Sequence, residues 1–128
     1  MKGIIMHQVY PLLSVLALLV IMLASSCEYE QRDAVDISDI PEVVSFSADV
    51  VPIFESKCTR CHGGTRPPDL TAENAYLSLT SGNYLDTEIP EESYLYKKID
   101  GNGSMSEYAD DHDRAVILKW IEQGAEEN

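Results

Sequence analysis

Hydrophobic residues recur three and four positions apart in several stretches of the chain, and none of these stretches keeps the alternation of a β-strand. The last stretch is the clearest, because Asp110 or Asp111 can cap its start and Gly124 can end it. Its apolar side is formed by Val116, Ile117, Trp120 and Ile121. We expect Trp120 to be a core residue, and the pattern as a whole predicts an all-α domain.

The predicted helix nearest the middle of the chain has two competing start signals. Ser47 is a suitable N-cap, and Phe46 before it could pack onto Val51. Pro52 lacks the N–H that a helix interior uses, so the regular helix is expected to begin there. The glycines at positions 63–64 would end the helix.

Two shorter helices are predicted between this helix and the last one. Thr71 could cap the first, which would end at Gly82, and Pro90 could open the second, which would end at Gly101. Their core residues are expected to be Ala75, Tyr76, Leu79, Leu95 and Ile99. The residues from 101 to 110 are interpreted as a flexible polar loop.

The N-terminal segment follows a different pattern. Lys2 precedes an apolar run over residues 12–23, and small residues then lead to Cys27, as in a secretory signal. The run is short for a membrane-spanning helix, which needs about 20 apolar residues. Its end resembles a bacterial lipoprotein box, which implies cleavage of residues 1–26 and a lipid on Cys27. Ordinary cleavage with a free Cys27, or an uncleaved anchor, are the alternatives.

Composition divides the rest of the chain into a tether and a domain. Residues 27–44 are acidic and aperiodic, so we interpret them as a tether, and residues 45–128 as the folded domain. The net charge of −13 disfavours nucleic acid and anionic lipid surfaces and suits protein partners with basic patches, although it could serve solubility alone. We expect an exported bacterial lipoprotein, anchored on the periplasmic side or at the outer membrane or cell surface.

The chemistry-bearing motif is CTRCH at residues 58–62, which matches the C-x-x-C-H pattern for c-type haem attachment. Residues three apart lie on one helix face, so Cys58 and Cys61 could both form thioethers with one porphyrin edge. His62 follows directly and could bind the iron. Phe54 shares the helical spacing of the cysteines and is expected to face the haem. The His62 ring should donate its other N–H to a carbonyl of the loop at residues 63–70.

Other uses of two cysteines are weaker. A structural zinc site needs four ligands, usually two Cys/His pairs. Outside the motif, the chain offers one further cysteine, Cys27, and one downstream histidine, His112. A thioredoxin-like dithiol would lie near a βαβ pattern, which the sequence lacks. A simple disulfide would leave His62 without a purpose.

The chain resembles the class I c-type cytochromes over residues 45–126, with a closing W-I-x-x-G-A sequence typical of a bacterial subgroup. The segments that carry the resemblance are Pro52–Phe54, Cys58–His62, Asp69–Leu70, Ser93–Leu95, Met105 and Trp120–Ala125. The resemblance implies a small cytochrome c fold, in which N-terminal and C-terminal helices cross around one covalent haem c. It implies haem links at Cys58 and Cys61 and a proximal iron ligand at His62. Met105 matches the distal ligand by position.

Met105 is also favoured as the sixth iron ligand by its chemistry. It is the apolar residue of its loop, and its soft thioether suits ferrous haem. The alternative is His112, which lies among three aspartates at the start of the last helix. Those carboxylates keep its surroundings wet, so we expect Met105 to bind the iron instead.

Two functions of different classes follow from this reading. With both axial positions filled, the protein would be a one-electron carrier that binds no small-molecule substrate and is not an enzyme. With an open distal site, it would be a haem peroxidase or small-gas sensor, for which His112 and Tyr108 are the candidate polar groups. A subunit that relays electrons within a larger oxidoreductase complex is a further alternative.

Overall fold

The computed structural model describes residues 37–128, so the predicted signal segment and Cys27 lie outside the described residues. The described part of the chain is helical and contains no strand, which confirms the all-α prediction. No helix in this part is long and apolar enough to cross a bilayer. The elements in order are η1 (Ile37–Asp39), η2 (Phe46–Val50), α2 (Val51–Ile53), η3 (Phe54–Cys58), α3 (Thr59–His62), α4 (Ala75–Ser81), η4 (Pro90–Glu92), α5 (Tyr94–Ile99), η5 (Ser106–Tyr108) and α6 (Asp111–Glu122).

Elements η2, α2, η3 and α3 form one continuous helical run, and its start differs from the prediction. The N-cap is Ser45, not Ser47, because the Ser45 side chain accepts a hydrogen bond from the Ala48 N–H. The helix also begins before Pro52. The turn before Pro52 is π-helical, with the Val51 N–H bonded to the Phe46 carbonyl, and this wider turn accommodates a residue that would otherwise clash with the preceding turn.

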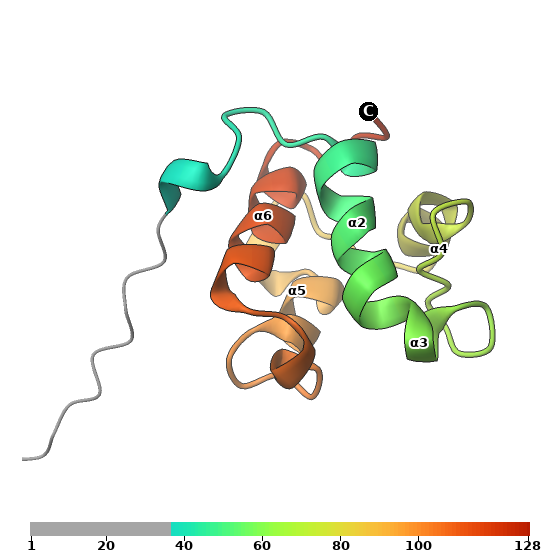
Figure 1. Ribbon diagram of the computed structural model, residues 1–128. Coiled ribbons are helices and arrows are strands. Elements are labelled where there is room, and N and C mark those ends of the chain that lie inside the picture. The colour runs from blue at the N-terminus through green and yellow to red at the C-terminus, as the bar shows by residue number, and fades with distance from the viewer. Residues whose placement is uncertain (1–36) are drawn as a thin grey trace, which may run out of the picture. The chain divides into compact units, whose positions relative to one another are not determined.

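The core lies where this helical run meets α6, side by side in Figure 1. The Phe46 ring is central, with its centroid 4.9 Å from that of Trp120 and 5.4 Å from that of Tyr76. Phe54 is buried beside it, at a centroid distance of 6.5 Å. The predicted apolar side of α6 is buried, and Trp120 is a core residue as expected. The pairing joins residues far apart in sequence into one core.

The two middle helices form close to their predicted places but begin later. Asn74 is the N-cap of α4, while Thr71 donates to the Asp69 carboxylate at 2.8 Å and so does not cap the helix. Pro90 opens only the short η4. Ser93 then interrupts the helix, since its hydroxyl bonds both the N–H and the carbonyl of Asp86. The predicted core residues Ala75, Leu79, Leu95 and Ile99 are buried, and Tyr76 is partly buried.

Backbone hydrogen bonds fold the loop between α5 and α6 against α5. The Met105 N–H donates to the Lys98 carbonyl at 2.8 Å, and the Gly103 N–H donates to the Asp100 carbonyl at 2.6 Å. A side chain at Gly103 would collide with the Lys98 carbonyl, because an added Cβ would lie only 2.2 Å from that oxygen. The segment expected to be a flexible polar loop is thus a hydrogen-bonded one that needs glycine for its close approach to α5.

Local signals set both ends of α6. Asp110 and Asp113 form a capping box, in which each side chain accepts a hydrogen bond from the backbone N–H of the other. Gly124 lies just past the end of the helix with φ of +99°, a conformation that glycine adopts without strain. Both predicted end signals of α6 are therefore confirmed.

Candidate functional site

The C-x-x-C-H motif ends the first helical run. Cys58 is the N-cap of α3, and the turn before it is π-helical, with the Thr59 N–H bonded to the Phe54 carbonyl. Cys58 is partly buried against the core and Cys61 is exposed. Both thiols are free, so the pair does not form a disulfide. Two unbonded sulfurs one helical turn apart suit a bridge to a single external group.

The imidazole of His62 is oriented by the loop that follows it. Its Nδ1 lies 3.2 Å from the Pro68 carbonyl oxygen, and because a carbonyl only accepts, Nδ1 carries the proton. This confirms the predicted bond to a loop carbonyl and identifies the acceptor. In the neutral ring, Nε2 then holds a free lone pair, the form that binds iron.

The loop returns to His62 through backbone geometry. The Leu70 N–H donates to the His62 carbonyl at 2.7 Å and closes the loop. Gly64 has φ of +92°, which a residue with a side chain rarely adopts, so the turn that directs Pro68 back to the ring depends on glycine. The loop thus holds the ring of His62 in place, as the partners of metal-binding histidines usually do.

The surroundings of Cys58 do not activate its thiol. Burial, together with the nearby Asp113 carboxylate, raises the pKa of the Cys58 thiol to about 11. The attacking cysteine of a redox dithiol instead has a pKa lowered below that of free cysteine, so Cys58 does not suit that role. A zinc site is also unsupported, because Cys58 and Cys61 are the only cysteines among the residues that the structure describes. The donor set of two thiols and one oriented imidazole fits haem attachment best.

Lys57, which precedes the motif, connects it to the start of α6. Its ammonium group donates to the Asp110 carboxylate at 2.7 Å and also to that of Asp113. Asp113 is the charged residue in the core, with a side-chain exposure of 7%. The hydrogen bond from Lys57 is the largest cause that lowers the pKa of Asp110 to about 2. These ion pairs hold the motif helix against the N-terminus of α6.

The same carboxylates bear on a possible metal site. Ligand atoms of Asp110, His112 and Asp113 lie within 4.8 Å of one another. The Lys57 ammonium already pairs with both carboxylates and offsets one of their two negative charges. The cluster therefore serves as a structural ion pair within the protein.

The loop that carries Met105 lies at the same end of the domain as α3, at the bottom of Figure 1. Tyr108, three residues on, has a raised pKa, chiefly because of its side-chain hydrogen bond with Glu107. Met105 and His112 are both exposed, Met105 at 38%, and His112 lies within the first turn of α6.

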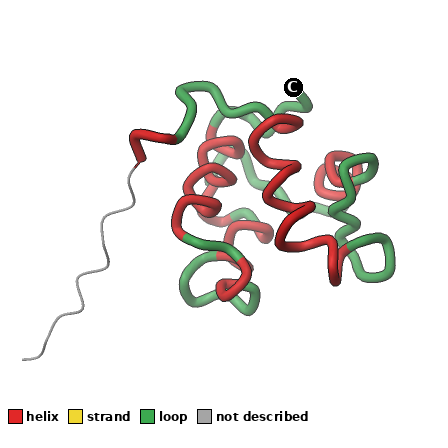
Figure 2. The backbone as a smooth tube through the Cα atoms, in the orientation of Figure 1, coloured by secondary structure: helices red, strands yellow, loops and turns green. Residues whose placement is uncertain are grey.

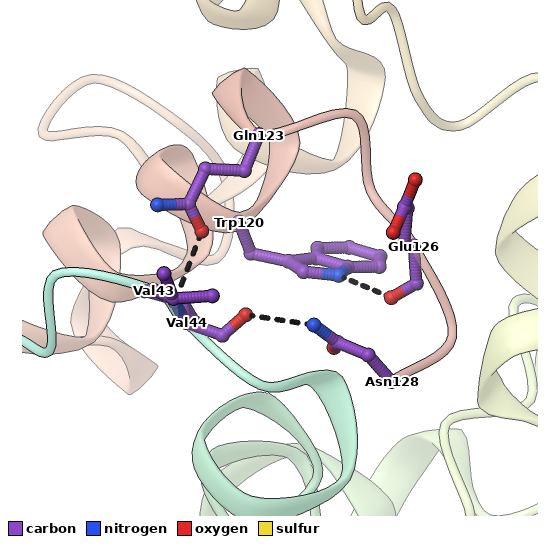
Figure 3. A pocket seen from close by; sticks show the side chains of 6 residues that line it. All are labelled: Val43, Val44, Trp120, Gln123, Glu126 and Asn128. Carbon is purple, nitrogen blue, oxygen red and sulfur yellow. Dashed lines mark hydrogen bonds between the residues drawn. The ribbon is translucent and has the colours of Figure 1, made fainter.

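A hollow in the surface lies away from this site. It measures about 190 Å³ and is lined by Val43, Val44, Trp120, Gln123, Glu126 and Asn128 (Figure 3). Gln123 accepts a hydrogen bond from the buried Val44 N–H, and the Trp120 indole N–H donates to the Glu126 carbonyl. Its polar groups thus bond to one another and tie Val44, the last residue of the predicted tether, to the domain.

Sequence reasoning missed two residues near the candidate site, Lys57 and Arg114. Each bridges segments that are distant in sequence, so spacing along the chain gives no signal for it. The one available hint is charge. Lys57 is a cation directly before Cys58, and the aspartates around His112 require a counter-charge.

Comparisons with family models, with curated proteins and with solved structures found no match for this chain.

Proposed function

We propose that this protein is a monohaem c-type cytochrome that transfers single electrons. The observation that carries the proposal is the state of the motif: free thiols at Cys58 and Cys61, followed by His62 with its Nδ1 proton bonded to Pro68. That bond leaves Nε2 as the ligand atom. A zinc site or a redox dithiol would need other ligands or a lowered thiol pKa.

The helical architecture supports the finer assignment to a small cytochrome c fold. The first helical run contacts α6 through Phe46 and Trp120, which matches the pairing of N-terminal and C-terminal helices that the resemblance implies. The motif follows at the end of that run, and the loop with Met105 precedes α6. Figure 2 shows the helices of the described residues and the loops that join them. This order puts the proposed proximal and distal ligands on separate segments.

In this proposal, each residue has a defined task. Cys58 and Cys61 hold the haem as thioethers, and His62 presents Nε2 to the iron while Pro68 prevents its ring from turning. Met105 supplies the sixth ligand and so excludes small-molecule substrates. The bound haem supplies a one-electron ferric/ferrous couple, whose potential a Met/His pair keeps comparatively high.

The proposal includes a place and a class of partner. A lipid on Cys27 would anchor the exported domain to a bacterial membrane and raise its effective concentration near redox partners. With a net charge of −13, the protein would dock on basic surfaces, and electron transfer should slow as the salt concentration rises.

The test is expression of the full chain with cytochrome c maturation machinery, followed by intact mass and visible spectra. We expect one covalently added haem that survives denaturation, and a weak methionine–iron band near the red end of the oxidised spectrum. Cys58→Ala with Cys61→Ala should remove the covalent haem. A mass without haem would refute the proposal, while attached haem without that band, and open to carbon monoxide, would favour the peroxidase or sensor.

A further inference from the structure

Arg114 joins three parts of the chain around the loop that carries Met105. It lies in the second turn of α6, and its side chain is only 16% exposed. Its Nε donates to the carbonyl of Ile99 at 2.6 Å, and one terminal nitrogen donates to the carbonyl of Ser106 at 2.7 Å. The other terminal nitrogen pairs with the Asp111 carboxylate. One guanidinium group therefore binds the end of α5, the middle of the loop and the start of α6.

These bonds restrain the backbone on both sides of Met105. The Met105 N–H donates to the Lys98 carbonyl at 2.8 Å, and the next residue, Ser106, accepts from Arg114. The Ile99 carbonyl belongs to the last turn of α5, where carbonyls lack helical partners, so Arg114 satisfies it. A planar fork with fixed directions is required to reach both carbonyls at once.

We propose that Arg114 is a positioning residue, which holds the 100–110 loop in the conformation that presents the Met105 sulfur to the haem iron. The inference rests on the proposed function, because it concerns the same iron site. Met105 is 38% exposed, so packing around it does not fix its side chain, and its placement depends on the backbone. Arg114 acts only through the loop and touches no reacting atom.

The experiment compares Arg114→Met, Arg114→Lys and Lys119→Met in the haem-loaded full chain. Arg114→Met keeps the length and packing of the stem and removes all three polar contacts. Arg114→Lys keeps the charge but cannot bridge two carbonyls. Lys119→Met removes a positive charge further along α6 and is the matched control. The readouts are the methionine–iron band, carbon monoxide binding to the reduced protein, and hydrogen exchange of the Met105 amide.

We expect Arg114→Met to lose most of the band, to bind carbon monoxide and to exchange the Met105 amide at least about tenfold faster, since a hydrogen bond to a charged group contributes about 1.5 kcal/mol or more. Arg114→Lys should change all three readouts in the same direction. If Arg114→Met does not fold, Arg114→Lys takes its place in the test. Lys119→Met should match the wild type.

Two results would overturn the inference and are distinguishable. If the wild type shows the band and Arg114→Met and Arg114→Lys both keep it and stay closed to carbon monoxide, Arg114 does not position the ligand. If the wild type carries covalent haem but lacks the band, Met105 is not the ligand, and the role of Arg114 fails together with that part of the proposed function.

Discussion

Removal of the Lys57 ammonium should destabilise the domain far more than removal of an exposed lysine. In Lys57→Met, the nearly buried Asp113 carboxylate keeps only its bond from the Asp110 N–H. Breaking a fully buried ion pair costs about 3–5 kcal/mol. The Lys57 side chain is 32% exposed, so water compensates in part, and we expect a loss of about 2 kcal/mol in the free energy of unfolding at neutral pH.

The pH dependence of stability gives a second expected magnitude, for the pair of Lys57 with Asp110. The pKa of Asp110 is lowered from 3.8 to about 2, chiefly by Lys57, so this stabilisation is fully present above pH 3.8 and is lost as pH falls through about 2. The shift corresponds to at most about 2.5 kcal/mol. Because the Asp110 side chain is 62% exposed, solvent screening reduces this to about 1 kcal/mol. The difference in unfolding free energy between wild type and Lys57→Met should therefore decrease by about that amount in acid.

The assay is urea unfolding, followed by far-UV circular dichroism at about pH 7, pH 4 and pH 2. Lys97→Met is the matched control, since Lys97 pairs with Glu92 at 2.7 Å on the surface, with side-chain exposures of 55% and 59%. It should cost less than about 0.5 kcal/mol. Lys57 does not stabilise the buried carboxylate if Lys57→Met loses no more unfolding free energy than this control, or if its loss is unchanged between neutral pH and about pH 2.

Three further outcomes are expected. Met105→Ala should abolish the methionine–iron band, admit carbon monoxide and lower the reduction potential, while His112→Ala should leave all three nearly unchanged; the reverse pattern would make His112 the ligand. Cys27→Ser should release the protein from the membrane fraction, and a wild-type protein recovered entirely in soluble form would contradict lipidation. Gln123→Ala should cost about 1 kcal/mol in urea unfolding, because the buried Val44 N–H loses its partner, and an unchanged midpoint would exclude this role.

Where all the signals for an element lie within one short segment, the sequence was sufficient to predict that element. The start, the apolar face and the end of α6 were all predicted, because a capping aspartate, a stripe that includes Trp120 and the terminal Gly124 act over a few residues. The C-x-x-C-H motif is equally local, since its chemistry depends on the spacing of Cys58, Cys61 and His62 alone.

Tertiary contacts decided the choices between equivalent local signals. Ser45 and Ser47 are both suitable caps. Asn128 accepts hydrogen bonds from the N–H groups of Phe46 and Ser47, which have no helical partner in the first turn of a helix that begins at Ser45, so Ser45 takes the cap position. A residue at the far end of the chain thus selects the start of the first helix, which no local pattern contains.

Tertiary contacts also determine the surroundings of the candidate site. The sequence determined that a loop carbonyl should meet His62, but only the return of the chain from Gly64 to Leu70 selects Pro68. Arg114 and Lys57 act across larger separations, the latter on a carboxylate 56 positions away. Such pairs form because packing α6 on the first helical run leaves charges in the core that require partners, a condition created by the fold and not by local sequence.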